Sequence, residues 1–147
     1  MQTSGITDIA HSIQLAVAPV FLLSGVGIIL TVLTNRLARI IDRGRSLEGA
    51  LPTATDAVAT GMNAELRTLS RRAQLIQRAI TLSTACALLI CVVIVTLFAG
   101  VALGRDLSGL IVVLFIAALF AFIGALLAFL LEIRAATAYL RFGPGPH

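Results

Sequence analysis

Apolar residues fill three long stretches of the chain, and polar residues lie between them. Residues 13–35, 79–103 and 107–131 contain no Asp, Glu, Lys or Arg. Each stretch exceeds the ~20 residues with which an α-helix crosses a hydrocarbon core of ~30 Å. The pattern therefore predicts an all-α protein with three transmembrane helices.

The helical pattern continues after the first stretch and resumes before the second. Apolar or small residues follow one another alternately at spacings of four and three, which is the heptad pattern of a coiled coil. They occupy positions 33, 37, 40, 44, 47 and 51, and then 62, 66, 69, 73, 76 and 80. Pro52 ends the first series and Gly61 precedes the second, with small polar residues between them that favour a turn. The first and second helices are predicted to extend into an antiparallel coiled-coil hairpin over residues 36–78.

Antiparallel pairing also predicts which residues meet across the hairpin. The numbers of facing residues then add to a constant, here 113, so that Leu37 faces Ile76 and Gly44 faces Leu69. Where a small residue faces a large one, the large side chain occupies the space that the small one leaves, and the layer fills without voids. The alternative is that both segments are amphipathic helices that lie on the inner leaflet, held there by arginine and anionic lipid.

Composition agrees with a membrane protein, and the charge distribution predicts its orientation. The 147 residues are 59% hydrophobic and 12% charged, with a mean hydropathy of +1.02, which is too apolar for a soluble domain. We expect a single membrane domain over residues 1–147. All 11 basic residues are arginine, and only Arg105 lies between the second and third stretches. The positive-inside rule then places residues 36–78 and the C-terminus in the cytoplasm and the N-terminus outside.

Several classes of function are not supported by the sequence. The pI of about 10.5 could suggest nucleic acid as a partner, but no aromatic residues alternate with the arginines and no nucleic-acid motif is found. No nucleophile or acid–base pair can be nominated, and no P-loop or dinucleotide motif occurs, so we expect no enzyme activity and no cofactor. His11 and His147 lie near opposite ends of the chain, and no metal site is expected.

Small and hydroxyl residues follow one side of the first predicted span. They share a stripe about 100° wide on a helical wheel, and we refer to them as the small-residue stripe: Ser24, Gly27, Thr31, Thr34 and Asn35. Such a stripe either lets helices approach closely or lines a polar path, and packing is the commoner use. The three predicted spans together offer more helix-contact surface than one copy can cover. We therefore predict a homo-oligomer in contact with membrane lipids.

A second group of residues carries excess positive charge just after the first span. Its members are candidate contacts for an anion, a lipid or a partner: Arg36, Arg39, Asp42, Arg43 and Arg72. In the predicted register Arg43 comes near Arg72 as a like-charge pair. Asp42 lies three residues from both Arg39 and Arg45 and can pair within its own helix. The group favours lipid headgroups, an acidic cytoplasmic protein or neighbouring copies, and the plain alternative is a solvated face.

One part of the sequence carries a family resemblance. Residues 13–48, with APVFLL at 18–23 and NRLARIIDR at 35–43, resemble the opening of a family of short bacterial inner-membrane proteins grouped under a domain of unknown function. The resemblance implies three spans and location in the bacterial inner (cytoplasmic) membrane. It implies no activity, substrate or catalytic residue.

Two functional hypotheses follow from these patterns. In the first, a homo-oligomer forms an ion-conducting pore, which the small-residue stripe lines and whose cytoplasmic mouth is ringed by Arg36, Arg39 and Arg43, favouring anions. In the second, the protein is a non-conducting scaffold or accessory subunit, and its cytoplasmic stalk binds a partner protein or anionic lipid. No charged residue lies within a span, which argues against a proton-coupled transporter.

Overall fold

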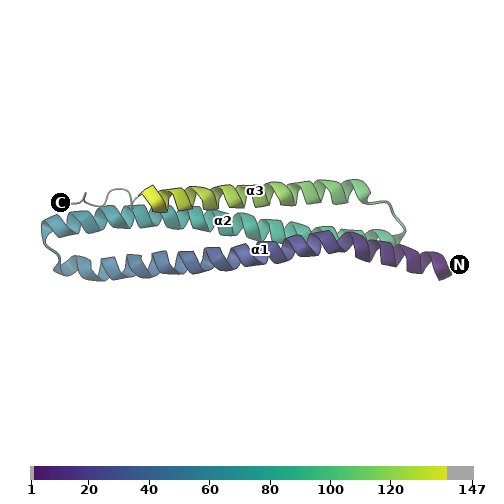
Figure 1. The fold of residues 1–147 in the computed structure, drawn as a ribbon, viewed down its shortest axis with the longest axis horizontal. Helices are drawn as coiled ribbons and strands as arrows, with labels where there is room; N and C mark the ends of the chain where they lie inside the picture. Colours follow the sequence, from purple (N-terminus) through teal and green to yellow (C-terminus); the bar gives the residue numbers. More distant parts are fainter. Residues whose placement is uncertain (1, 139–147) are drawn as a thin grey trace. The chain divides into compact units, whose positions relative to one another are not determined.

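A computed structural model describes the backbone of residues 2–138 and the side chains of Thr7 and residues 9–137. The chain forms three long helices, α1 (Gln2–Ala50), α2 (Asp56–Leu103) and α3 (Ser108–Ala138), and a short 3-10 helix, η1 (Leu51–Thr53), joins α1 to α2 (Figure 1). No strand occurs within residues 2–138. The all-α fold predicted from the sequence is confirmed.

All three helices are long and apolar enough to cross a membrane. The predicted spans lie inside them, apart from Leu107, which directly precedes α3. At 49 and 48 residues, α1 and α2 are more than twice the length of the ~20 residues that a bilayer requires. Both helices therefore continue beyond any single crossing, as the heptad pattern predicts.

The chain divides into two compact units, and each contains a segment of every long helix. Of the described residues, unit 1 comprises 2–30 and 82–124, and unit 2 comprises 31–81 and 125–138. In unit 1 the core is built from small and medium apolar side chains, with Val26, Cys86, Ile90 and Ala118 fully buried.

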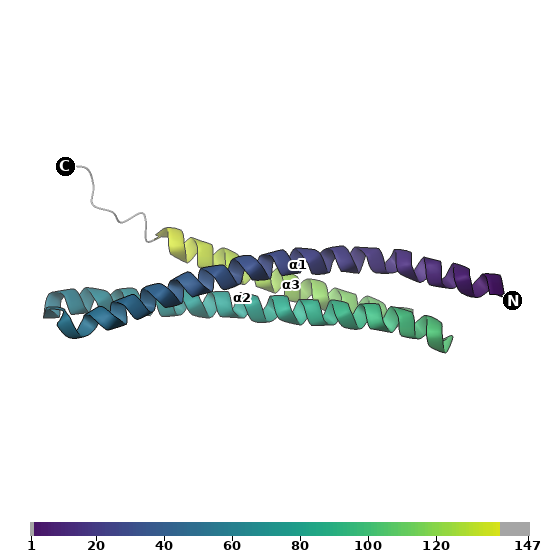
Figure 2. The ribbon, with the colours of Figure 1, turned by 90° about the horizontal axis from the view of Figure 1, so that it is seen from below.

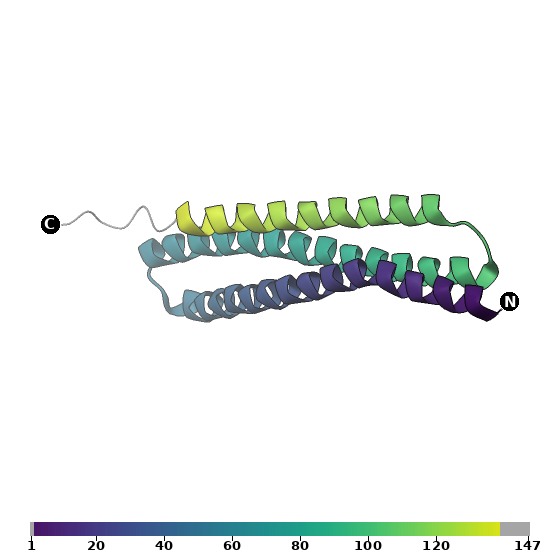
Figure 3. The same ribbon diagram turned by 45° about the vertical axis from the view of Figure 1, so that its right-hand side comes forward.

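In unit 1 the end of α2 is fixed by a glycine. Gly104 has a φ of +61°, in the left-handed region that glycine adopts without a steric penalty. Its N–H donates to the carbonyl of Val101 at 3.3 Å, and the N–H of Arg105 donates to the carbonyl of Gly100 at 3.0 Å. These two bonds make a Schellman motif, which satisfies the last carbonyls of the helix and turns the chain toward α3 (Figure 3).

The start of α3 depends on a carboxylate. The Oδ1 atom of Asp106 accepts a hydrogen bond from the backbone N–H of Ser108 at 3.0 Å. The pKa of Asp106 lies below its ordinary value because Ser108 donates hydrogen bonds to it, with the side chain of Ser108 contributing more than its backbone N–H. Because the charged form is the one that is bonded, this cap is present at neutral pH and weakens as pH falls toward the lowered pKa.

In unit 2 the chain reverses at η1, and the segments of α1 and α2 run in opposite directions from it (Figure 2). All twelve predicted heptad positions are buried or half-buried, and most positions between them are exposed. Leu33 and Ile76 are 0% exposed. Burial thus follows the predicted period, while the residue-by-residue pairing of Leu37 with Ile76 stays a prediction.

The packing expected at Gly44 is wrong. A Cβ atom built on Gly44 would meet nothing within 4 Å, so the side chain of Leu69 does not fill the space that this glycine leaves. Gly44 and Leu69 instead line one groove of about 310 Å³. The short side chains of Ser70 and Ala73 also line this groove.

An added Cβ would meet no neighbour at Gly44, but it would be strained at Gly104, where φ is positive. This contrast gives a stability prediction. Gly44→Ala is expected to raise the free energy of unfolding by about 0.5–1 kcal/mol, because alanine is the better helix former and meets no neighbour. Gly104→Ala is expected to lower it by about 1–2 kcal/mol, because a Cβ is disfavoured at positive φ. Thermal unfolding of each variant in detergent, followed by circular dichroism, measures both changes. Loss of stability in Gly44→Ala would show that the groove closes over this glycine.

Candidate functional site

One fully buried carboxylate in unit 2 lies between two arginines. Glu132 of α3 has a side-chain exposure of 0%, and its Oε2 lies 2.8 Å from Nη2 of Arg36 on α1. Its Oε1 accepts hydrogen bonds from Arg72 of α2, at 2.9 Å from Nη2 and 3.2 Å from Nε. We call these three residues the Glu132 cluster; each comes from a different long helix.

The cluster compensates a carboxylate that would otherwise be costly to bury. An ionised group removed from water loses several kcal/mol of hydration, which only well-placed partners offset. Both partners here are cations, and Arg36 also lies over the ring of Phe129, 5.4 Å from its centroid, where a cation–π contact holds the guanidinium. Within the described residues Oε2 has no hydrogen bond of good geometry, so its 2.8 Å contact with Arg36 is an ion pair without a well-directed hydrogen bond.

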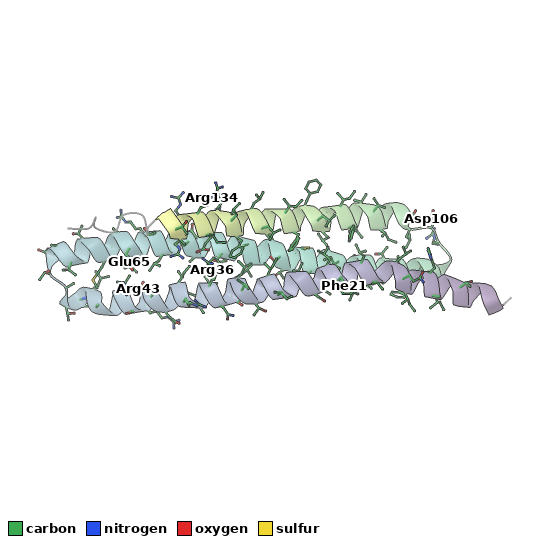
Figure 4. All side chains as sticks on the ribbon, in the orientation of Figure 1. Phe21, Arg36, Arg43, Glu65, Asp106 and Arg134 are labelled. Atoms are coloured by element: carbon green, nitrogen blue, oxygen red, sulfur yellow. The ribbon has the colours of Figure 1, made fainter. Side chains whose placement is uncertain are left out.

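A second ion pair joins α1 to α2 closer to η1. Nε of Arg43 donates to Oε1 of Glu65 at 2.9 Å, and Nη2 donates to Oε2 at 3.3 Å (Figure 4). This pair is more open to solvent, since the side chain of Arg43 is 56% exposed. Arg43 and Arg72, predicted to come near each other, line the same groove, and each also has a carboxylate partner that offsets their like charge.

Four of the five predicted anion contacts come together around one groove, which we call the arginine groove. It measures about 330 Å³ and is lined by Arg36, Arg39, Ile40, Arg43, Leu69 and Arg72. The fifth residue, Asp42, is exposed and does not line the groove. Among the described residues no ion pair joins Asp42 to Arg39 or Arg45, so the expected pairing within its helix is wrong.

The small-residue stripe faces outward in each unit. Ser24 and Gly27 of unit 1 are exposed, as are Thr31, Thr34 and Asn35 of unit 2. The hydroxyl of Ser24 donates to the carbonyl of Val20 at 3.2 Å, and that of Thr34 to the carbonyl of Thr31 at 3.1 Å. Because these hydroxyls donate to carbonyls of their own helix, the side chains can face lipid, another copy or a polar path. Both interpretations of the stripe therefore stay predictions.

Glu132 is the site residue that the sequence interpretation misses. It directly follows the third apolar stretch, where it is easily taken as a marker for the end of a span. A signal was nevertheless present, because an acid at the end of ~25 apolar residues is expensive unless it is paired. The predicted register gives no such signal, because it brings Arg43 near Arg72, whereas in the structure Arg43 pairs with Glu65 and both Arg36 and Arg72 contact Glu132.

The family of the chain follows from its sequence match. Residues 16–142 match the family described as "Protein of unknown function (DUF2721)". The chain belongs to this family. Membership in DUF2721 confirms the resemblance to a domain of unknown function. No curated protein and no solved structure matches the chain. The DUF2721 description assigns no activity, and the arginine groove is the feature of the chain that bears on its function.

Proposed function

We propose that this DUF2721 protein is a non-catalytic, homo-oligomeric scaffold or accessory subunit of the bacterial inner membrane, whose cytoplasmic hairpin binds an anionic group at the inner leaflet. The observation that carries the proposal is the gathering of four arginines around one groove. A solvated charged face would spread such side chains apart to lower their repulsion. Here they converge, and carboxylates hold three of them in place.

The position of the groove along the chain supports a ligand at the headgroup level. Arg36 directly follows the first apolar stretch, and Glu132 directly follows the third. Arg43 is seven residues further along α1, or about 10 Å at 1.5 Å per residue. In the predicted topology this distance lies within the cytoplasmic headgroup layer, where anionic lipids attract arginine by about 1 kcal/mol per residue.

Thermal stability in lipid nanodiscs tests this proposal. A ligand that binds only the folded state raises its stability, so the melting temperature of the wild type is expected to be higher in discs that contain phosphatidylglycerol than in phosphatidylcholine alone. Arg39→Gln is expected to remove much of this difference, because Arg39 lines the groove. Arg67→Gln is the matched control, since Arg67 is an exposed arginine of α2 that does not line the groove. If both variants lose the melting-temperature difference equally, the stabilisation comes from general surface charge and not from the groove.

An anion-conducting pore is the second candidate. It is favoured by the exposure of the small-residue stripe, which leaves that stripe available to surround an axis between copies. The ion pairs of Arg36 and Arg43 weaken it, because two of the three proposed mouth arginines have carboxylate partners. In planar bilayers, a conductance that changes in Thr31→Leu or Arg39→Glu would support the pore. Silence of the purified protein across voltage and pH would eliminate it.

A further inference from the structure

We infer that the arginine groove is a binding site for a phosphomonoester dianion, carried by a lipid or by a soluble molecule. This inference rests on the proposed function and specifies its ligand. Four guanidinium groups line the groove, and two of the carboxylates that contact them, Glu65 and Glu132, carry the opposing charge. The formal charge that remains is +2, which a single divalent anion neutralises.

The arginines have donors left for such an anion. Arg72 spends its Nε–H and one Nη2–H on Glu132, and a guanidinium carries five N–H donors. Arg39 lines the groove without an ion pair to any described residue. Its planar fork matches the spacing of two phosphate oxygens, which is why arginine is preferred where phosphate is bound in a bidentate manner.

The walls of the groove suit a partly dehydrated charge. Ile40 and Leu69, which form its apolar sides, are 7% and 9% exposed. Apolar walls lower the local dielectric constant and strengthen attraction between the arginines and an anion. A volume of about 330 Å³ is roughly ten times the ~30 Å³ that one water molecule occupies in the liquid. A phosphate group and the first atoms of its ester substituent therefore fit.

Chemistry favours the monoester over the diester. A monoester presents three terminal oxygens and carries close to two negative charges once its second proton leaves, with a pKa near 6. A diester presents two terminal oxygens and one charge. Neighbouring guanidinium groups favour the doubly ionised form, so binding of a monoester is expected to strengthen as pH rises through about 6.

Two anionic lipids, one a phosphomonoester and the other a phosphodiester, test the inference. Phosphatidic acid is a monoester and phosphatidylglycerol is a diester, and each is incorporated into phosphatidylcholine nanodiscs that hold the full chain. Lipid retained by the protein, measured by native mass spectrometry, is expected to favour phosphatidic acid by about tenfold, the equivalent of one additional charge-assisted hydrogen bond. Arg39→Gln is expected to abolish the preference, and Arg67→Gln is expected to keep it.

A soluble arm identifies the source of the phosphate. Glycerol 3-phosphate is added to protein in phosphatidylcholine discs, and its ³¹P linewidth reports binding directly. Broadening that Arg39→Gln removes assigns a soluble ligand, and a preference for phosphatidic acid without such broadening assigns a lipid. Equal retention of both lipids, together with no broadening, would overturn the inference. The proposed function would survive that result if both lipids still stabilise the wild type and not Arg39→Gln, and it would fail if neither lipid stabilises the wild type.

Discussion

Glu132→Ala is expected to lower the free energy of unfolding by about 3 kcal/mol, the low end of the range for breaking a buried ion pair. The substitution leaves Arg36 and Arg72 facing each other without the carboxylate that holds both. Their side chains are 32% and 23% exposed, so water relieves part of the repulsion, which is why we expect the low end. Reversible unfolding in detergent, followed by circular dichroism, gives the value.

The Arg43–Glu65 pair provides the matched control. Glu65→Ala removes a carboxylate that also bridges α1 and α2, but the pair is solvent-exposed, with Arg43 at 56%. Exposed pairs contribute about 0–1 kcal/mol. A cost of Glu65→Ala as large as that of Glu132→Ala would contradict the view that burial gives the Glu132 cluster its importance.

An apolar replacement of the whole cluster separates charge from packing. In the triple variant Arg36→Met, Arg72→Met and Glu132→Leu, all three charges of the Glu132 cluster are removed together. Buried ion clusters exchanged for apolar residues of similar volume are often neutral or stabilising, by up to about 4 kcal/mol. The triple variant is therefore expected to be at least as stable as the wild type, although it loses two arginines of the groove. If its stability instead resembles that of Glu132→Ala, the cluster stabilises the fold through the packing of its side chains and not through their charges.

The helices could be predicted from the sequence because the information that specifies them is local. Apolar stretches longer than 20 residues, a proline at position 52 and an alternation of four and three are all features of neighbouring residues. Burial at Leu33 and Ile76 follows the predicted heptads. The filling of space at Gly44 failed because it depends on where the side chains of a second helix end, and a sequence pattern does not contain that detail.

The candidate site could be predicted only in part, for the same reason. Four of its arginines were expected because they cluster in sequence and in heptad register. Glu132 was not expected, because its role requires knowing that α3 lies beside the segments of α1 and α2 in unit 2. The ion pair of Arg43 with Glu65 was not expected either, because a long side chain can reach several partners and the sequence does not determine which one it contacts.

Ile76→Ala is expected to lower the free energy of unfolding by about 2–5 kcal/mol, the usual cost of truncating a buried isoleucine. Ile76 is 0% exposed and occupies a heptad position of α2 in unit 2. Ile41→Ala is the matched control, because Ile41 is 41% exposed and its truncation leaves no cavity, so we expect a change within about 0.5 kcal/mol. Chemical unfolding in detergent compares the two variants under one condition.

A double-mutant cycle then tests the pairing that the heptads predict. If Leu37 faces Ile76, the losses in Leu37→Ala and Ile76→Ala share one contact, and the double variant is expected to depart from additivity by at least about 0.5 kcal/mol. Helices that lie separately on a membrane surface share no such contact, and their losses add. Additivity combined with a small effect of Ile76→Ala would therefore replace the hairpin with two surface helices. It would also remove the scaffold that brings Arg36, Arg43 and Arg72 around one groove.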